Sequence, residues 1–171
     1  MAHMIIHPIN HSFVAEISGV DIKSLTEGDL NKIYQAWLTY GVLRIRHQQL
    51  DEDELQSFSA RFGPLEEIPM GRLPESAKAK IKNRYVTQLS NIIENGKPIG
   101  GLGNAEASWH SDMTYVETPP PASVLLGIEI PAEGGDTYFA DQHAALAAMP
   151  EVLVKRISTL GIKHDASHTS V

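Results

Sequence analysis

His110 and Asp112 are the two side chains whose types and spacing suggest chemistry most directly in this sequence. On an extended backbone, residues i and i+2 project to the same face, so this imidazole and this carboxylate would both reach one metal ion. Two histidines and one carboxylate on one octahedral face hold iron(II) in oxygenases and leave three coordination positions open. On the spacing alone, a surface histidine beside an aspartate remains an open alternative.

The composition limits the classes of protein to which the chain can belong. With 171 residues, 42% of them hydrophobic, it can form one domain or part of one. A net charge of −7 with scattered basic residues argues against nucleic-acid or membrane partners and favours a small-molecule substrate. The absence of cysteine excludes disulfides, thiolate metal ligands and a cysteine nucleophile. No stretch has the roughly 18 apolar residues of a membrane span, so we expect a cytoplasmic protein.

The first three residues precede a second methionine at Met4. They are interpreted as a cloning remnant and left out of the fold.

The first half of the chain predicts two helices with clear boundary signals. Thr26 can cap a helix that ends at Gly41, and Asp51 with Glu54 forms a capping-box pattern at the start of a second helix. Strands are predicted over residues 13–17 and 42–46.

The second half predicts mainly strands. A glycine-rich segment between Asn91 and Ala107 is interpreted as a hairpin or lid beside a site. Further strands are expected over residues 85–89, 123–130 and 137–139. Asp141 and Pro150 each mark the start of a short helix. These elements favour an α+β arrangement on an antiparallel β core, and the glycines do not form a phosphate-binding loop.

Several sequence blocks carry a resemblance to a known family. They are Trp-His-Ser-Asp-Met-Thr-Tyr at 109–115, Glu-Thr-Pro-Pro at 117–120 and Gly-Gly-Asp-Thr at 134–137. Arg-Phe-Gly at 61–63 and Ile-Ser-Gly-Val-Asp at 17–21 add to them. Together they resemble the taurine dioxygenase and 2,4-dichlorophenoxyacetate dioxygenase family of Fe(II)/2-oxoglutarate-dependent oxygenases, over essentially the whole chain.

This resemblance implies a double-stranded β-helix (jelly-roll) core with helices packed outside, and iron(II) at its mouth. His110 and Asp112 match the first two iron ligands, and Thr137 matches a threonine that hydrogen-bonds the cosubstrate carboxylate. The implied reaction uses Fe(II), O2 and 2-oxoglutarate to hydroxylate a small organic substrate, with release of succinate and CO2. Asn91 and Glu106 are candidate substrate-binding residues, although an asparagine in a turn and a solvated glutamate are the plainer explanations.

The family's third ligand, a histidine, and its cosubstrate-binding arginine would lie far beyond the last residue. His168 is a weak substitute for that histidine. Its spacing from His164 would suit one helical face, although a strand end and a loop are the plainer account of these two residues. Residues 4–171 are therefore predicted to be the N-terminal part of a single dioxygenase domain that lacks its C-terminal strands. Such a chain would be inactive alone and would have to satisfy its open edges, for example as a homo-oligomer.

The family's taurine-using members have a histidine and a tyrosine where this sequence has Ile68 and Gly71, which disfavours taurine. Two other functional classes stay open on the sequence. One is a cupin-like metal enzyme of another reaction class, and the other is a non-catalytic β domain that binds a small molecule.

Overall fold

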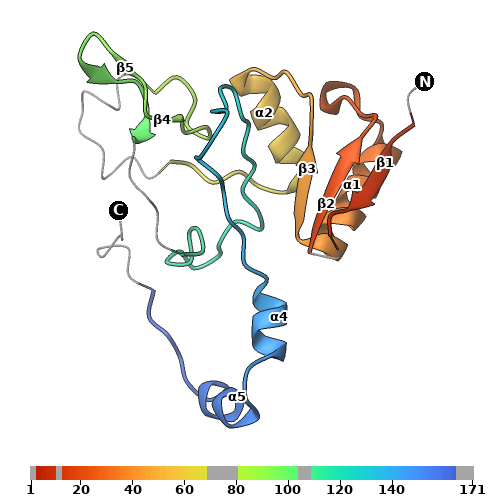
Figure 1. The fold of residues 1–171 in the computed structure, drawn as a ribbon, viewed down its shortest axis with the longest axis vertical. Helices are drawn as coiled ribbons and strands as arrows, with labels where there is room; N and C mark the ends of the chain where they lie inside the picture. Colours follow the sequence, from red (N-terminus) through yellow and green to blue (C-terminus); the bar gives the residue numbers. More distant parts are fainter. Residues whose placement is uncertain (1–2, 11–12, 69–80, 104–108, 165–171) are drawn as a thin grey trace.

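The computed structural model describes residues 3–10, 13–68, 81–103 and 109–164 (Figure 1). The strands are β1 (Ile5–Pro8), β2 (Val14–Ser18), β3 (Val42–Ile45), β4 (Leu89–Ser90), β5 (Ile93–Glu94), β6 (Lys97–Pro98) and β7 (Gly101–Leu102). The α-helices are α1 (Glu27–Tyr40), α2 (Glu52–Ser59), α4 (Gln142–Ala147) and α5 (Glu151–Ile157), and the 3-10 turns are η1 (Ile22–Ser24) and η2 (Ala60–Phe62). We call residues 5–62 the N-terminal unit and residues 81–164 the C-terminal region.

Side-chain caps set the helix starts in the N-terminal unit. The Thr26 hydroxyl accepts a hydrogen bond from the Asp29 amide at 3.1 Å, and this amide would otherwise have no partner within α1. Asp51 and Glu54 cap each other's backbone amides at 2.8 and 3.0 Å, which confirms the capping box of α2. Gly41 ends α1 with a φ of 75°, a conformation that favours glycine.

The N-terminal unit contains a three-stranded sheet in the order β1-β2-β3. Strand β1 runs antiparallel to β2, with Ile6 opposite Ile17, whereas β2 and β3 are parallel, with Val14 opposite Val42. Parallel neighbours need a crossover connection, and α1 provides it. The sheet is therefore mixed, which differs from the antiparallel core that the strand pattern had favoured.

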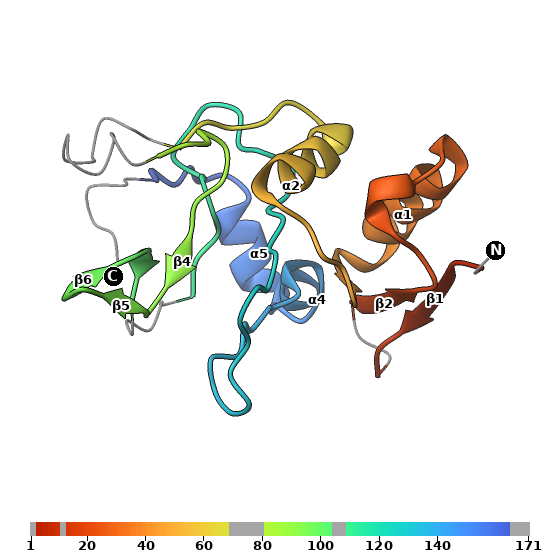
Figure 2. The ribbon, with the colours of Figure 1, turned by 90° about the horizontal axis from the view of Figure 1, so that it is seen from above.

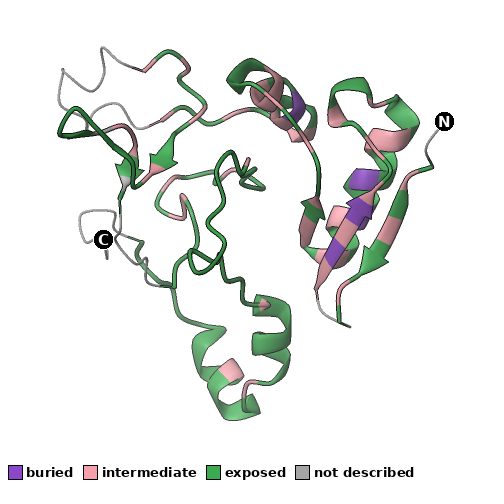
Figure 3. Ribbon diagram, turned by 45° about the horizontal axis from the view of Figure 1, so that its top comes forward, coloured by how far each residue is buried: buried purple, intermediate pink, exposed green. Residues whose placement is uncertain are grey.

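Helix α1 lies along one face of the sheet, as Figure 2 shows from above, and the core of the N-terminal unit lies between them. Ala15 and Ile17 alternate with half-buried residues along β2, and both are fully buried. Ile33 and Ala36 of α1 bury the facing side. With Phe58 of α2 they are all the buried residues in the described part of the chain, and Figure 3 shows them confined to β2, α1 and α2.

Four aromatic rings connect the two helices of the N-terminal unit. Tyr34 and Trp37 of α1 lie against Phe62 of η2, with ring centroids 6.4 and 6.1 Å apart. Phe58 of α2 meets Phe62 edge-on at 5.2 Å. Such pairs stabilise a contact beyond the area that they bury, so this cluster holds α2 to α1.

The other face of the sheet carries charge. Glu16 of β2 binds Arg44 and Arg46 at 2.7 and 2.8 Å. The hydrogen bond from Arg46 holds the pKa of Glu16 below its ordinary value; partial burial opposes this shift, and Arg44 adds to it.

At the start of α1, the Thr26 hydroxyl lowers the pKa of Asp29 by hydrogen-bonding its carboxylate at 2.6 Å.

The C-terminal region has short elements and long irregular segments. Strands β5 and β6 form the predicted hairpin, and Asn95 and Gly96 both have positive φ, as a type I′ turn requires. Strands β4 and β7 form a parallel pair. The predicted helix starts at Asp141 and Pro150 are confirmed by α4 and α5.

The expected strands over residues 123–130 and 137–139 are wrong: both segments are irregular. Of the residues 85–89 that were expected to form a strand, only Leu89 does so. It belongs to β4, which also contains Ser90. A strand forms only where a second strand pairs with it, and an alternating sequence cannot provide that partner. No helix in the described ranges is long and apolar enough to cross a membrane.

Candidate metal centre

His110 and Asp112 lie in an irregular segment that tightens into a turn after Ser111. Met113 has a φ of 54°, and its carbonyl accepts a hydrogen bond from the Val116 amide at 3.2 Å. A positive φ at a residue with a long side chain is uncommon. The turn thus redirects the chain directly after the two candidate ligands.

The structure brings the polar ends of these two side chains together. Nε2 of His110 lies 3.1 Å from Oδ1 of Asp112. The second carboxylate oxygen, Oδ2, accepts a hydrogen bond of 2.9 Å from the hydroxyl of Ser123. The His110 and Asp112 side chains are 55% and 59% exposed, so the pair is open to an incoming ion.

The separation of the two donor atoms suits a metal ion. Nitrogen and oxygen ligands lie about 2.0–2.2 Å from a divalent metal, and two such ligands at a right angle are about 3 Å apart. The observed 3.1 Å is therefore close to one edge of an octahedron. Imidazole nitrogen and carboxylate oxygen also match the donor types of a non-haem iron site.

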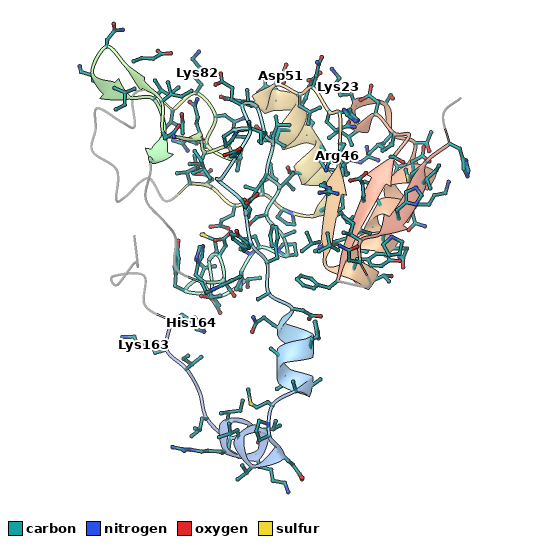
Figure 4. All side chains as sticks on the ribbon, in the orientation of Figure 1. Lys23, Arg46, Asp51, Lys82, Lys163 and His164 are labelled. Carbon is teal, nitrogen blue, oxygen red and sulfur yellow. The ribbon has the colours of Figure 1, made fainter. Side chains whose placement is uncertain are left out.

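A third metal ligand is not found among the described residues, which contain no group of three or more His, Asp or Glu side chains able to hold an ion. His164 lies beside Lys163 on the segment after α5, well separated in Figure 4 from Lys23 and Asp51 of the N-terminal unit. His168 lies outside the described residues.

The other predicted site residues occupy different segments. Thr137 is exposed in the irregular stretch after Gly135, and Asn91 is exposed between β4 and β5. Glu106 and Gly71 lie outside the described residues. Ile68 is described, and its amide donates to the Arg84 carbonyl at 2.8 Å.

Ser123 is the residue at this centre that the sequence did not reveal. It lies eleven positions after Asp112, beyond the prolines at 119–121. A proline run signals a stiff connection, because each ring fixes φ near −65°. The proline run does not indicate where the chain goes after it, so the spacing could not predict the hydrogen bond between Ser123 and Asp112.

Comparison with known proteins identifies the family of the chain. Residues 6–171 match the model of the family described as "Taurine catabolism dioxygenase TauD, TfdA family". The chain belongs to this family.

Three curated relatives show what the family contains. The chain is 28% identical to an (S)-phenoxypropionate/alpha-ketoglutarate-dioxygenase of Sphingobium herbicidovorans, over 96% of this chain and 54% of the relative. It is 28% identical to an alpha-ketoglutarate-dependent 2,4-dichlorophenoxyacetate dioxygenase of Cupriavidus pinatubonensis, over 95% and 58%. It is 30% identical to an alpha-ketoglutarate-dependent sulfate ester dioxygenase of Pseudomonas putida, over 93% and 48%. The chain thus spans about half the length of these relatives.

A solved structure matches the path of the chain. It is a Burkholderia xenovorans protein described as a candidate alpha-ketoglutarate-dependent 2,4-D dioxygenase, with a TM-score of 0.62 and 25% identity. The match covers 92% of this chain and 51% of that one. The fold of this chain is therefore similar to that of the Burkholderia protein over nearly the whole chain.

Proposed function

We propose that this chain forms part of an Fe(II)- and 2-oxoglutarate-dependent dioxygenase that hydroxylates a small organic substrate and releases succinate and CO2. The observation that carries the proposal is the 3.1 Å separation between Nε2 of His110 and Oδ1 of Asp112 in a chain of this family. The relatives are named for 2-oxoglutarate (alpha-ketoglutarate) and for small organic substrates.

His110 and Asp112 would hold the iron through one nitrogen and one oxygen. When bound, ferrous iron would supply the oxidative chemistry, in which one oxygen atom of O2 enters the substrate and the other enters succinate. The contribution of the chain is positional: the two side chains offer adjacent donors and leave the remaining coordination positions to other ligands.

The hydroxyl of Thr137 is proposed to donate a hydrogen bond to a carboxylate of 2-oxoglutarate. The Thr137 side chain is exposed, and it lies two positions after the pair Gly134 and Gly135, which both have positive φ. Asn91 and Glu106 are proposed as substrate contacts, with Asn91 exposed beside the β5–β6 hairpin.

Residues 4–171 are proposed to be the N-terminal part of a single jelly-roll domain. Many large apolar side chains are exposed in the C-terminal region, among them Ile128 at 81% and Ile162 at 80%. Apolar surface of this extent is uncommon on a complete domain. Further strands of a family-length protein would cover it and would give the irregular segments their partners.

The decisive variant is Asp112→Ala in the full-length protein. Loss of a ligand oxygen should lower substrate-dependent succinate formation by at least about 100-fold, because even indirect partners of metal ligands cost 10–100-fold when removed. Succinate and O2 uptake would be measured with Fe(II) and 2-oxoglutarate. Asp53→Ala, an exposed aspartate of α2, serves as the matched control and should leave turnover unchanged.

Retained turnover in Asp112→Ala would contradict the proposal. Turnover that needs neither O2 nor 2-oxoglutarate would also contradict it and would indicate a metal enzyme of another reaction class.

A further inference from the structure

The two oxygens of the Asp112 carboxylate face different partners. Oδ1 lies 3.1 Å from Nε2 of His110, whereas Oδ2 accepts the hydroxyl hydrogen of Ser123 at 2.9 Å. An ionised carboxylate has two equivalent oxygens, so this difference comes entirely from its neighbours.

An exposed aspartate needs such a neighbour to keep one orientation. The terminal torsion of an aspartate is broad, so the side chain alone does not fix how the plane of its carboxylate is turned relative to the imidazole. A hydrogen bond to an ionised acceptor is stronger than one between neutral groups. The Ser123 hydroxyl therefore favours the rotation of the carboxylate that turns one oxygen toward Ser123 and the other toward His110.

The fold delivers Ser123 to this position through a stiff connection. The turn at Met113 reverses the chain directly after Asp112, and the prolines at 119–121 then restrict the backbone before Ser123. A restricted loop loses less entropy when its ends meet than a flexible one does. The hydrogen bond between Ser123 and Asp112 is thus supported by the segment that separates them.

We infer that Ser123 is a positioning residue for the metal-binding carboxylate: it holds Oδ2 of Asp112 and leaves Oδ1, beside His110, to bind the metal through a single oxygen. This inference rests on the proposed function. Residues that hydrogen-bond a metal ligand orient it, and their removal typically weakens metal binding by 10–100-fold. Binding through one oxygen also leaves more coordination positions open than binding through both.

The experiment is a titration of the metal-free, full-length protein with Co(II), followed by calorimetry and by the visible absorption of the bound ion. Ser123→Ala should weaken Co(II) binding by about 10-fold. It should also change the absorption spectrum, because the freed carboxylate can bind through both oxygens. Ser123→Thr keeps a hydroxyl at the same position, and it should restore both the affinity and the spectrum.

Ser57→Ala is the matched control. Ser57 is an exposed serine of α2 whose hydroxyl also donates a hydrogen bond, to the Asp53 carbonyl at 2.7 Å. Ser57→Ala should leave the Co(II) affinity and the absorption spectrum as they are in the wild type. Far-UV circular dichroism of each metal-free variant should match the wild type, since Ser123 is exposed.

His110→Ala separates the two proposals. If it abolishes Co(II) binding while Ser123→Ala binds as the wild type does, the role of Ser123 is overturned and the proposed function stands. If Co(II) binds the wild type and His110→Ala equally, both are overturned. A weaker, spectrally altered Ser123→Ala with a restored Ser123→Thr supports the inference.

Discussion

The N-terminal unit and the C-terminal region both contain alternating apolar sequence, but they use it differently. In the N-terminal unit, the apolar residues of β2 meet those of α1, and Ile17 and Ile33 are almost fully buried. In the C-terminal region, no described residue is buried. Of the exposed large hydrophobic residues among those that the structure describes, all but three lie in this region. The candidate metal centre lies in this open region.

The difference shows which elements can form without partners. Helices α4 and α5 form in the open region although Leu146 and Val152 are exposed, because helical hydrogen bonds lie within the segment. The alternating segment over 123–130 stays irregular, because a strand takes its hydrogen bonds from another segment. Apolar residues of the same types are therefore buried in the N-terminal unit and exposed in the C-terminal region.

Truncation of one isoleucine in each region should give the largest difference between the two regions in the free energy of unfolding. Ile17→Ala should lower the free energy of unfolding by about 2–5 kcal/mol, because it leaves a cavity between β2 and α1. Ile128→Ala removes the same atoms from a side chain that is 81% exposed, and the change should stay within about 0.5 kcal/mol. Both are measured on residues 1–171 by urea unfolding.

Fluorescence can report the N-terminal unit alone. The chain has two tryptophans, Trp37 in the aromatic cluster and Trp109 at 72% exposure, so a Trp109→Phe background leaves only Trp37. If Ile17→Ala and Ile128→Ala lowered the free energy of unfolding equally, the distinction between the two regions would be refuted.

Cap removal gives a smaller contrast. Asp51→Ala removes the cap of α2, which packs through Phe58, and should cost about 1 kcal/mol in the same unfolding measurement. Asp141 caps α4 through the amides of His143 and Ala144, but α4 buries no residue. Asp141→Ala should therefore lower the helical circular dichroism while leaving the Trp37 transition in place, and a shifted transition would mean that α4 packs on the N-terminal unit.

The smallest effect concerns acid stability. The pKa of Glu16 is lower in the folded chain than its unfolded value of about 4.3, chiefly because Arg46 donates to its carboxylate. A carboxyl group with a depressed pKa stabilises the fold above the unfolded pKa, and this contribution is lost as the pH falls through the folded value. Glu16→Gln should thus weaken the acid dependence of unfolding below about pH 4.5.

The measurement is a series of urea transitions between about pH 3 and pH 7. Glu94→Gln, an exposed carboxylate of β5 in the C-terminal region, is the control and should leave the acid dependence as it is. An unchanged acid dependence in Glu16→Gln would show that the two arginines do not couple to folding.

Much of the N-terminal unit was predictable because its signals are local. Thr26, Gly41 and the Asp51 capping box fixed the helix boundaries correctly, since each acts within about one turn of the helix. The mixed character of the sheet was not predictable, because the direction of β2 relative to β3 depends on where α1 returns the chain. At the candidate metal centre, the two-residue spacing brought His110 and Asp112 into consideration, but Ser123 gave no signal.

By itself, the sequence determined the helix caps, the Asn95-Gly96 hairpin and the pair of donors two positions apart, because these features depend on neighbours along the chain. The tertiary structure decided which apolar segments became strands, which residues were buried, and that Ser123 reaches Oδ2 of Asp112. Those outcomes depend on contacts between residues distant in sequence, whose formation is governed by the path of the whole chain.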